Sequence, residues 1–368
     1  MLDRVRVFGP AYLDRVIRTD GPILGDANAP PLDQSVGGRP GFGNGQGLTL
    51  VDPEGASLAI APPGDWPGPW GVVDLDRPLG AAPGSRRELR ALGWRDDLGG
   101  MGAGFAAALG GVLVSAVGPE DDPTSEAVAR LLDRHGVVHR PIRTGPPADW
   151  TLLLSSAEHG DKLAVGFRGC HDALAAEDLA PCLADPPDVL IVAGLPNRPA
   201  VTVLNAPGPR LRVLAPSIRN TTDPETPLRA LIAPVDVLCC NRGEWEALED
   251  REEVAARLSI LVVTEGAAGS TARFTDPQGG SRRIRIPAFR RSRPPLDVNR
   301  AGEAFASFFI RSMLEAGWRP ESCTAEVEMV RGSMIRASAA SALVLDLGSF
   351  GFPSPAEVDA AAARGLVD

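Results

Sequence analysis

The chain has 368 residues, of which 44% are hydrophobic and 23% charged, an ordinary composition for a globular protein of one large domain or two. Its 37 Lys and Arg against 47 Asp and Glu give a net charge of −10, which argues against general affinity for nucleic acid or acidic membrane. No run of about 18 apolar residues predicts a membrane span, and the N-terminus lacks a secretory signal pattern. Five cysteines without a C-x-x-C pair, and four histidines without metal-ligand spacing, favour reduced thiols in a cytoplasmic protein over a disulfide framework or zinc site.

The N-terminal part of the chain predicts one strand and then a long irregular stretch. Residues 4–8 alternate apolar and polar side chains and end at a Gly-Pro pair, and Asp14 lies just beyond this predicted strand. Residues 18–95 are dense in Gly, Pro and Asp, with only brief strand-like runs such as 48–51 and 58–61. We expect a loop-rich insertion or lid here, because so long a connection without regular structure is usually functional.

The next part of the chain predicts regular elements. Residues 99–110 predict a glycine loop that runs into a helix of small residues, followed by a strand over 112–118 and a helix over 125–136. Apolar runs over 151–154 and 163–167, on either side of a polar turn, predict a hairpin.

The second half of the chain alternates apolar strands with helical patterns. Strands are predicted over 189–194, 211–215, 235–240 and 260–264. This pattern is typical of a mainly parallel sheet that is covered on both faces and binds ligands at the carboxyl ends of its strands. Two further helices are expected, over 337–345 and over 355–364, the second capped by Ser354.

A loop, a turn of small residues and the start of a helix follow one another between residues 296 and 309. Apolar residues recur there at helical spacing, at Phe305, Phe308, Phe309 and Met313. Ala301 and Gly302 leave the first N–H groups of this helix open to an anion, and Asp297 and Glu303 add carboxylates on either side. Phosphoryl transfer to an alcohol needs such an anion site beside a base. The alternative is a helix start whose acidic residues only complement the helix dipole.

The dinucleotide fingerprint G-x-G-x-x-A is matched by residues 102–107, with Gly102 and Gly104 as its glycines. Arg95-Asp96-Asp97, which precede them, do not look like a buried strand, so we expect no NAD binding. Close approach of a small ligand or of another helix explains the glycines better, and packing alone is the alternative.

Two polar segments follow predicted strands. Asn241 and Glu244 lie one helical turn apart, where an amide and a carboxylate suit hydrated Mg²⁺, although an N-cap Asn with a Glu at N3 explains the same pattern. The segment from Thr264 to Gly269 offers a hydroxyl and flexible backbone to a nucleotide, or is simply a turn. The sequence contains neither a P-loop motif nor the nucleophile elbow of hydrolases.

In this order along the chain, these segments resemble the PfkB/ribokinase family of sugar and nucleoside kinases. The matches are the first strand with Asp14, Gly99-Gly100 (family GG-x-x-x-N), Asn241-Arg242-Gly243-Glu244 (N-x-x-E), Thr264 to Gly269 (T-x-G-x-x-G) and Asp297 to Phe305 (D-T-x-G-A-G-D-x-F). The resemblance covers most of residues 1–20 and 98–365. It implies an α/β fold, a ribokinase-like three-layer sandwich with a mainly parallel central sheet and a small β lid.

The resemblance also implies one kinase domain over residues 1–368, with a lid from part of 18–95 and a hairpin within 140–170. The implied activity is ATP- and Mg²⁺-dependent phosphorylation of a small sugar or nucleoside. The implied catalytic residues are Glu303 as base and Arg300, Ala301 and Gly302 as anion hole, with Asp297 beside them. The implied substrate residues are Asp14, Gly99, Gly100 and Gly104, with Arg168 a candidate for an anionic group on the substrate. Asn241 and Glu244 would organise Mg²⁺, and Thr264, Gly266 and Gly269 would flank the nucleotide.

The chain departs from the family pattern at several of these positions. The family's G-A-G-D is Arg300-Ala301-Gly302-Glu303 here, so the first glycine is Arg and the catalytic aspartate is Glu. Glu has nearly the same intrinsic pKa as Asp but reaches one methylene further. Arg300 either supplies a cation to the transferred phosphate or fills the anion hole. The asparagine of the GG motif falls on Gly104, and an aspartate of a later strand falls on Ala215.

Two functions of different class follow. The first is the sugar-like kinase, and the second is a catalytically lapsed relative that binds a nucleotide or sugar as a sensor or interaction module. We expect no nucleic-acid or membrane partner, and analogy with the family suggests a homodimer through the lid.

Overall fold

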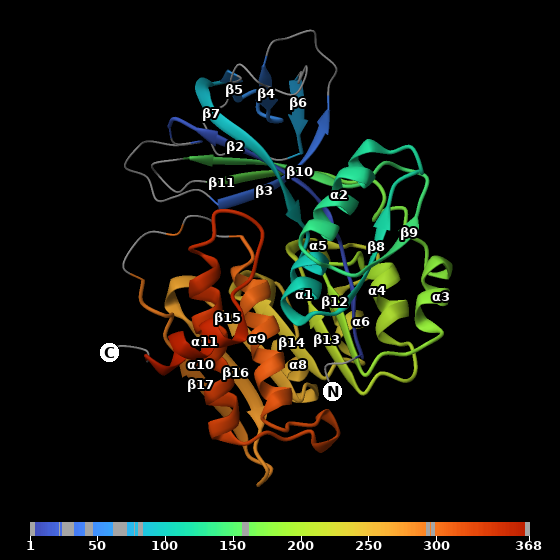
Figure 1. The fold of residues 1–368 in the computed structure, drawn as a ribbon, viewed down its shortest axis with the longest axis vertical. Helices are drawn as coiled ribbons and strands as arrows, with labels where there is room; N and C mark the ends of the chain where they lie inside the picture. Colours follow the sequence, from blue (N-terminus) through green and yellow to red (C-terminus); the bar gives the residue numbers. More distant parts are fainter. Residues whose placement is uncertain are drawn as a thin grey trace.

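The structure is a computed structural model that describes residues 4–21, 23, 33–40, 47–61, 72–76, 78–79, 84–156, 162–291, 295 and 299–364, with 33–40 described by backbone alone. It consists of an α/β body and a β-sheet lid (Figure 1). Within the described ranges, no helix is both long and apolar enough to cross a membrane.

The described strands of the body form one nine-stranded sheet in the order β17-β16-β15-β14-β13-β12-β1-β8-β9. They are β1 (Val5–Phe8), β8 (Val112–Val117), β9 (His139–Arg143), β12 (Val189–Ala193), β13 (Leu211–Ala215), β14 (Val237–Asn241), β15 (Ile260–Thr264), β16 (Ser270–Thr275) and β17 (Ser281–Ile286). Neighbours from β9 to β15 pair in parallel, and β16 and β17 are added antiparallel at one edge. The predicted parallel sheet is therefore confirmed, with four of its apolar strands close to the predicted ranges.

Helices cover both faces of this sheet because its central strands are apolar on both sides. Along β12, Val189 and Ile191 pack into one buried cluster, whereas Leu190 and Val192 pack into the cluster on the opposite face. The first cluster includes residues of α1 (Met101–Leu109), α2 (Pro123–Arg134), α9 (Ala301–Glu315) and α10 (Val327–Val344). The second includes residues of α3 (Ala180–Leu183), α4 (Asn197–Leu204), α6 (Leu228–Ile232) and α8 (Arg251–Arg257).

Three shorter features complete the body. The helices α5 (Ile218–Thr222) and α7 (Arg242–Glu246) follow directly from the carboxyl ends of β13 and β14. The last helix, α11 (Pro355–Ala363), packs against α9 and α10, and the predicted cap is confirmed because Ser354 Oγ accepts a hydrogen bond from Glu357 N.

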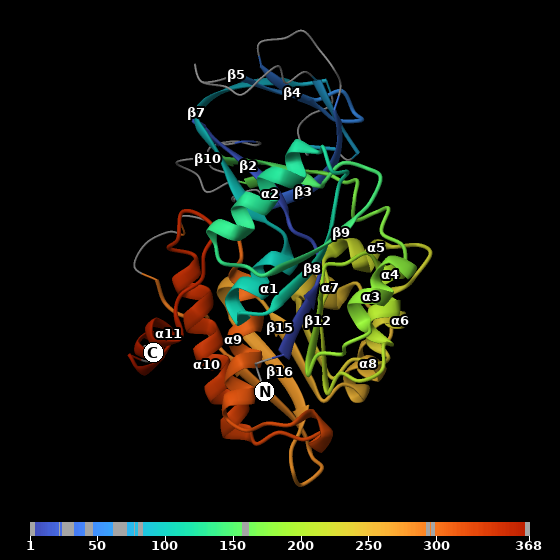
Figure 2. The same ribbon diagram turned by 45° about the vertical axis from the view of Figure 1, so that its right-hand side comes forward.

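The lid is a closed barrel in the strand order β10-β11-β3-β6-β4-β5-β7-β2. Its strands are β2 (Tyr12–Thr19), β3 (Asp33–Pro40), β4 (Leu48–Val51), β5 (Ser57–Ala61), β6 (Val72–Leu75), β7 (Arg86–Gly99), β10 (Trp150–Ser156) and β11 (Lys162–Phe167). A separate apolar cluster fills it, including Ile17, Leu50, Ile60, Leu152 and Val165. Figure 2 shows β7 running from this barrel down to α1 in the body.

The lid corrects two expectations from the sequence. The described part of residues 18–95 is not loop-rich, because strands β3 to β7 lie within or begin in it. Arg95-Asp96-Asp97 belong to the 14-residue strand β7, whose last three residues are buried. β7 is held by pairing with its distant partners β2 and β5. Its Gly and Asp residues have low strand propensity, so the local sequence does not predict this strand. The predicted hairpin of β10 and β11 is confirmed.

Candidate active site

The predicted substrate residues meet where β2 and β7 leave the lid and enter the body. Asp14 on β2 is 7% exposed, and its Oδ1 atom accepts no hydrogen bond from any described residue. A Cβ atom at Gly99 would lie 2.5 Å from the Asp14 carboxyl group, so only glycine leaves room for it. Gly100 has φ of 100°, and a Cβ there would lie 2.2 Å from the Pro10 carbonyl oxygen. The double glycine therefore lets the backbone close tightly around a buried carboxylate.

Burial raises the pKa of Asp14 to about 7, although the nearby Lys162 and Arg300 charges oppose the rise. The same two cations act on Glu303, whose pKa is also raised by burial. Tyr12 lies in the same region, and burial together with the Asp14 charge raises its pKa to about 12. Charges on the lid strands β2 and β11 and at the start of α9 therefore act on one another. A buried and a half-buried carboxylate that both have raised pKa values are typical of a functional site.

The start of α9 has the geometry of an anion site with one unusual residue. Arg300 precedes the helix with φ of 66°, in the left-handed region that costs a non-glycine residue about 1–2 kcal/mol. Its guanidinium lies over the Phe350 ring, 5.7 Å from the centroid. Gly302 is exposed, and a Cβ built on it would meet nothing within 4 Å. The backbone at Gly302 is therefore accessible to a ligand. Asp297 lies outside the described residues.

Glu244 and Asn241 stand at the carboxyl end of β14. Asn241 Oδ1 accepts a hydrogen bond from Glu244 N, and Asn241 N donates to Glu244 Oε2, both at 2.9 Å. This is the N-cap arrangement that the sequence also allowed. Burial and the charge of Glu303 raise the pKa of Glu244 to about 7, which places the two glutamates in the same environment. A divalent cation would relieve this repulsion, so the donor set fits hydrated Mg²⁺.

Thr264 is the register partner of Asn241 on the neighbouring strand, so both stand at the same edge of the sheet. The turn that follows it is a tight connection to β16, in which Glu265 N donates to Gly269 O at 2.8 Å. Gly266 and Gly269 have φ of 58° and 94°, which explains both glycines by backbone conformation. The predicted nucleotide residues therefore share one sheet edge, and their nucleotide role stays a prediction.

Arg168 and Gly104 also lie near the site. The guanidinium of Arg168 lies over the Tyr12 ring, 4.9 Å from its centroid, and 3.9 Å from Asp149 Oδ2. Gly104 lies in α1 with its Cα facing the side chain of Glu303. Both predicted positions therefore lie beside Tyr12 and Glu303 in the folded chain.

Two further residues of the site gave no signal in the sequence. Lys162, the first residue of β11, donates a hydrogen bond to Asn299 Oδ1 and so links the lid to the segment before α9. Asp97 is buried at the end of β7 and accepts a hydrogen bond of 2.9 Å from Phe350 N. This contact holds the ring on which Arg300 lies. Each contact joins segments far apart in the chain, which is why no local pattern predicts it.

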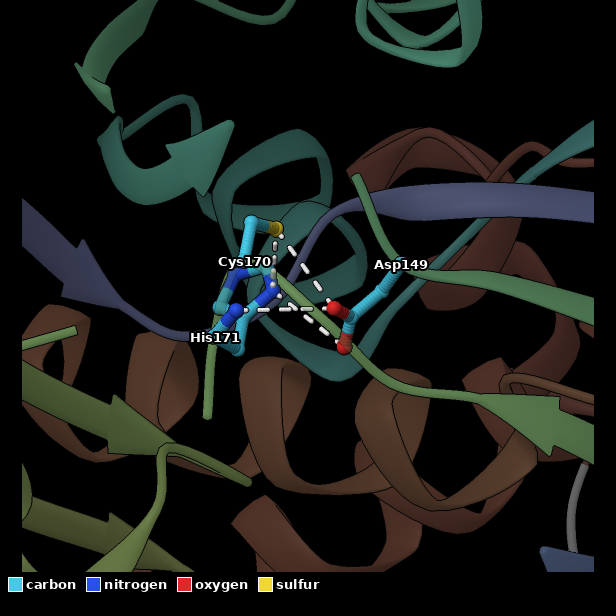
Figure 3. Close-up of side chains that lie close together, drawn as sticks. All are labelled: Asp149, Cys170 and His171. Carbon is cyan, nitrogen blue, oxygen red and sulfur yellow. Dashed lines mark hydrogen bonds and ion pairs between the residues drawn. The ribbon is translucent and has the colours of Figure 1, made fainter. Parts of the chain in front are cut away.

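A second polar cluster lies buried where β10 begins and the segment after β11 returns to the body (Figure 3). Cys170 Sγ lies 3.5 Å from Asp149 Oδ1 and 3.3 Å from His171 Nδ1, and His171 Nδ1 lies 3.4 Å from Asp149 Oδ2. Thiol, imidazole and carboxylate are the ligand types of a transition metal. The sequence gave no metal-ligand spacing here, because the fold and not the spacing brings Asp149 to the Cys170-His171 pair.

Hydrogen bonds within the chain account for this cluster. Ser115 Oγ accepts from Ala11 N and lies 3.1 Å from His171 Nε2, and Asp149 Oδ1 accepts from Gly169 N at 2.8 Å. A proton on His171 Nδ1 can be donated to Asp149, and Nε2 faces the Ser115 hydroxyl. Burial alone would raise the pKa of Asp149, but the hydrogen bond and charge of His171 lower it to about 2. Burial raises the pKa of the Cys170 thiol to about 12, so it is a poor nucleophile.

The fold defines the class of protein to which the chain belongs. It matches Giardia lamblia ribokinase with a TM-score of 0.65 at 15% sequence identity, covering 99% of both chains. It matches Burkholderia thailandensis nucleoside kinase, solved with inosine, with a TM-score of 0.61 at 14% identity and 98% coverage of both chains. It also matches Arabidopsis thaliana ribokinase, solved with ribose and ATP, with a TM-score of 0.59 at 16% identity, covering 98% of this chain and 99% of that one. The chain therefore has the ribokinase fold.

The family follows from the sequence comparison. The profile of the pfkB family carbohydrate kinases matches residues 89–356, which is more than half of the chain. The protein therefore belongs to the PfkB family, whose members are sugar and nucleoside kinases, and the predicted family is confirmed. A comparison with curated proteins gave no match.

Proposed function

We propose that the protein is an ATP- and Mg²⁺-dependent kinase that transfers the γ-phosphoryl group to a hydroxyl group of a small sugar-like or nucleoside substrate. The observation that carries this proposal is the pair of carboxylates, Asp14 buried and Glu303 half-buried, that share the charges of Lys162 and Arg300 next to the exposed backbone of Gly302. A hydroxyl that donates to Asp14 Oδ1 would give that atom the hydrogen bond it lacks among the described residues.

Glu303 is the proposed general base. Its raised pKa strengthens it as a proton acceptor once it is ionised, and its place in the first turn of α9 sets it next to the exposed residue Gly302. The Gly302 amide and the cation of Arg300 are proposed to hold the transferred phosphoryl group, because both can offset its negative charge. Arg168 remains a candidate for an anionic group on the substrate.

Bound ATP and Mg²⁺ supply the phosphoryl group and offset its charge. Glu244, with Asn241, is proposed to organise the hydrated ion, and Thr264, Gly266 and Gly269 to flank the nucleotide. The support is that the Glu244 carboxylate shares its environment with Glu303 and that Thr264 is the register neighbour of Asn241. A homodimer through the lid is also proposed by analogy. Because the described lid strands close into a barrel, such a dimer would use the outer barrel surface and not a free sheet edge.

A screen of ATP consumption over sugars and nucleosides tests the proposal. Glu303→Gln keeps the size of the side chain but removes its ability to accept a proton, so we expect turnover to fall by about 10²–10⁴-fold. The matched control is Glu328→Gln on α10, whose carboxylate is 82% exposed and, within the described part of the chain, forms an ion pair with Arg331 at 3.5 Å. It should keep wild-type turnover.

The alternative function is that of a catalytically lapsed relative that binds a nucleotide or sugar. Thermal stabilisation by nucleotide without turnover of any substrate would contradict the kinase and support a binding module. The strained backbone of Arg300, where the family has glycine, is the observation that favours this alternative.

A further inference from the structure

Three neighbouring strands of the lid place one residue each in a row, which we call the lid row: Asp14, Thr151 and Gly166. Asp14 on β2 is the register partner of Thr151 on β10, and Thr151 is the register partner of Gly166 on β11. Register partners on paired strands lie on the same face of a sheet, and successive residues alternate between the faces. Leu152 and Val165, which follow Thr151 and precede Gly166, belong to the apolar cluster inside the barrel. The lid row therefore lies on the outer face of the barrel.

This outer face is turned toward the body. Figures 1 and 2 show β2 and β10 on the side of the lid nearest to the body, with β4 and β5 on the far side. Asp97, the register partner of Asp14 on β7, accepts a hydrogen bond from Phe350 N of the body. Lys162 on β11 donates to Asn299, which comes just before α9. The lid row therefore lies at the junction of the lid with the body, beside the proposed active site.

Three polar atoms at the lid row form no hydrogen bond with any described residue. Two are Thr151 Oγ1 and Asp14 Oδ1, on residues that are 4% and 7% exposed. The third is Arg168 Nη1, which lies 3.9 Å from Asp149 Oδ2, too far for a hydrogen bond. A Cβ at Gly166 would lie 2.6 Å from Arg168 Nη2 and 2.9 Å from its Cζ, so the guanidinium lies where a side chain of residue 166 would be. The glycine thus brings a third polar group into the lid row, beside Thr151.

A ligand with several hydroxyl groups complements these atoms. They are a carboxylate oxygen that accepts, a hydroxyl that donates and accepts, and an N–H group that only donates. Buried polar atoms without a partner cost stability, and a ligand that supplies the partners explains why such atoms are kept together. Because adjacent strands lie about 4.8 Å apart, hydroxyl groups on neighbouring carbon atoms can reach Asp14 and Thr151 at once.

We propose that Thr151 is a specificity-determining residue, which binds a substrate hydroxyl on the carbon next to the one whose hydroxyl is bound by Asp14. The substrate class is then a sugar or nucleoside with hydroxyl groups on two adjacent carbons. Arg168, a candidate for an anionic group, is the next donor along the lid row. This inference rests on the proposed function, in which Asp14 accepts a hydrogen bond from the substrate.

The first test is Thr151→Val, which replaces the hydroxyl by a methyl group of similar size. For a substrate found in the ATP-consumption screen, we expect the KM to rise about tenfold, the effect of one lost hydrogen bond. A hydroxyl that does not react is bound equally before and during the reaction, so kcat should stay within about twofold and the KM for ATP should not change. Thr151→Ser keeps the hydroxyl and should keep the KM within about threefold of the wild-type value. An unchanged KM for Thr151→Val would overturn the inference.

The matched control is Thr271→Val on β16. Thr271 is 5% exposed, and its Oγ1 atom also lacks a hydrogen-bond partner among the described residues. Its register partners are Val263 and Arg285, neither of which carries a carboxylate. Thr271→Val should leave the substrate KM unchanged. An equal rise in KM for the two variants would contradict a specific role of Thr151.

The second test uses analogues of the same substrate that each lack one hydroxyl. One analogue should lose about tenfold in kcat/KM with the wild type and nothing further with Thr151→Val, as expected when the two missing hydroxyls are partners. If every analogue loses the same factor with both proteins, the inference is wrong.

Melting temperatures test the inference without turnover. Thr151→Val removes a buried hydroxyl without a partner, so the variant without ligand should melt at a higher temperature than the wild type, as should Thr271→Val. A lower melting temperature for Thr151→Val would overturn the inference, because the hydroxyl would then have a partner within the chain. The sugars and nucleosides of the screen should stabilise Thr151→Val less than they stabilise the wild type.

The two measurements separate this inference from the proposed function. If ligands stabilise the wild type without being phosphorylated, and Thr151→Val loses that stabilisation, the proposed function fails and the inference stands. If a substrate is phosphorylated and Thr151→Val keeps the wild-type KM, the inference fails and the function stands. If no sugar or nucleoside is bound or phosphorylated, both fail.

Discussion

Two buried aspartates in this protein have similar exposure and opposite electrostatics. Asp14 in the proposed active site is 7% exposed, and Asp149 at the lid junction is 2% exposed. The pKa of Asp14 is raised to about 7, whereas that of Asp149 is lowered to about 2. Burial raises the pKa in both places, so burial does not separate them.

Hydrogen bonds account for the different pKa values of the two aspartates. Asp149 accepts from Gly169 N and faces the His171 ring, whereas Asp14 Oδ1 accepts from no described residue. A carboxylate whose donors come from its own chain contributes to the fold. One that is buried without donors costs stability and is retained for a ligand that brings them. The cluster of thiol, imidazole and carboxylate is thus structural in character, although its residue types are those of a chemical site.

The largest effect is expected at Asp14. Asp14→Asn keeps the shape and removes the charged acceptor, which is worth about 1.5–3 kcal/mol in a hydrogen bond, so kcat/KM should fall on the order of 100-fold. The variant should nevertheless melt at a higher temperature than the wild type above pH 7. A group with a raised folded-state pKa contributes stability that is present below its unfolded pKa of about 4 and lost as pH rises through about 7. Melting curves at pH 4 and pH 8 would refute this if the variant's advantage did not grow with pH.

At Asp149 we expect substitution to lower stability and to leave activity largely unchanged. Asp149→Asn leaves the His171 ring with a weaker partner in a buried site, and we expect a loss of about 2 kcal/mol in urea unfolding. Because the pKa of Asp149 is depressed to about 2, its contribution is present above the unfolded pKa of about 4 and is lost as pH falls toward 2. Below its unfolding temperature the variant should keep most of its kcat. A loss of activity without a loss of stability would remove the contrast with Asp14.

The smallest effect is expected at Ser115. Ser115→Ala removes the hydroxyl between Ala11 N and His171 Nε2, and a neutral hydrogen bond of this kind contributes about 1 kcal/mol to the free energy of unfolding. Combined with Asp149→Asn, the losses should be less than additive if the three residues act as one network. Fully additive losses would show that Ser115 is independent of the aspartate.

Local sequence patterns were enough to predict the main strands of the body and the cap of its last helix. Runs such as 189–194 and 260–264 are apolar on both sides of the strand, which predicts a buried parallel strand, and Val189–Ala193 and Ile260–Thr264 are buried strands in the sheet. The cap at Ser354 is equally local. These features depend on neighbours within a few residues, so the sequence predicts them directly.

The lid could not be predicted in the same way. β7 carries polar and glycine residues that are poor strand formers, and its pairing with β2 joins residues about 80 positions apart, as in the Arg15 to Asp96 ion pair. The stretch therefore has the composition of a loop. Its structure comes from partners that no local window contains.

At the site, the sequence by itself determined which chemical groups are available and in what order: the acid at Asp14, the double glycine, the Asn241 to Glu244 pair and the acid at Glu303. The tertiary structure decided their state. It buried Asp14 with no described residue donating to its Oδ1 atom, set Glu303 against Gly104, and gave Asp149 the partners that keep it charged. The physical reason is that pKa and partner depend on burial and on contacts across the chain, such as Ser115 with His171, 56 residues apart.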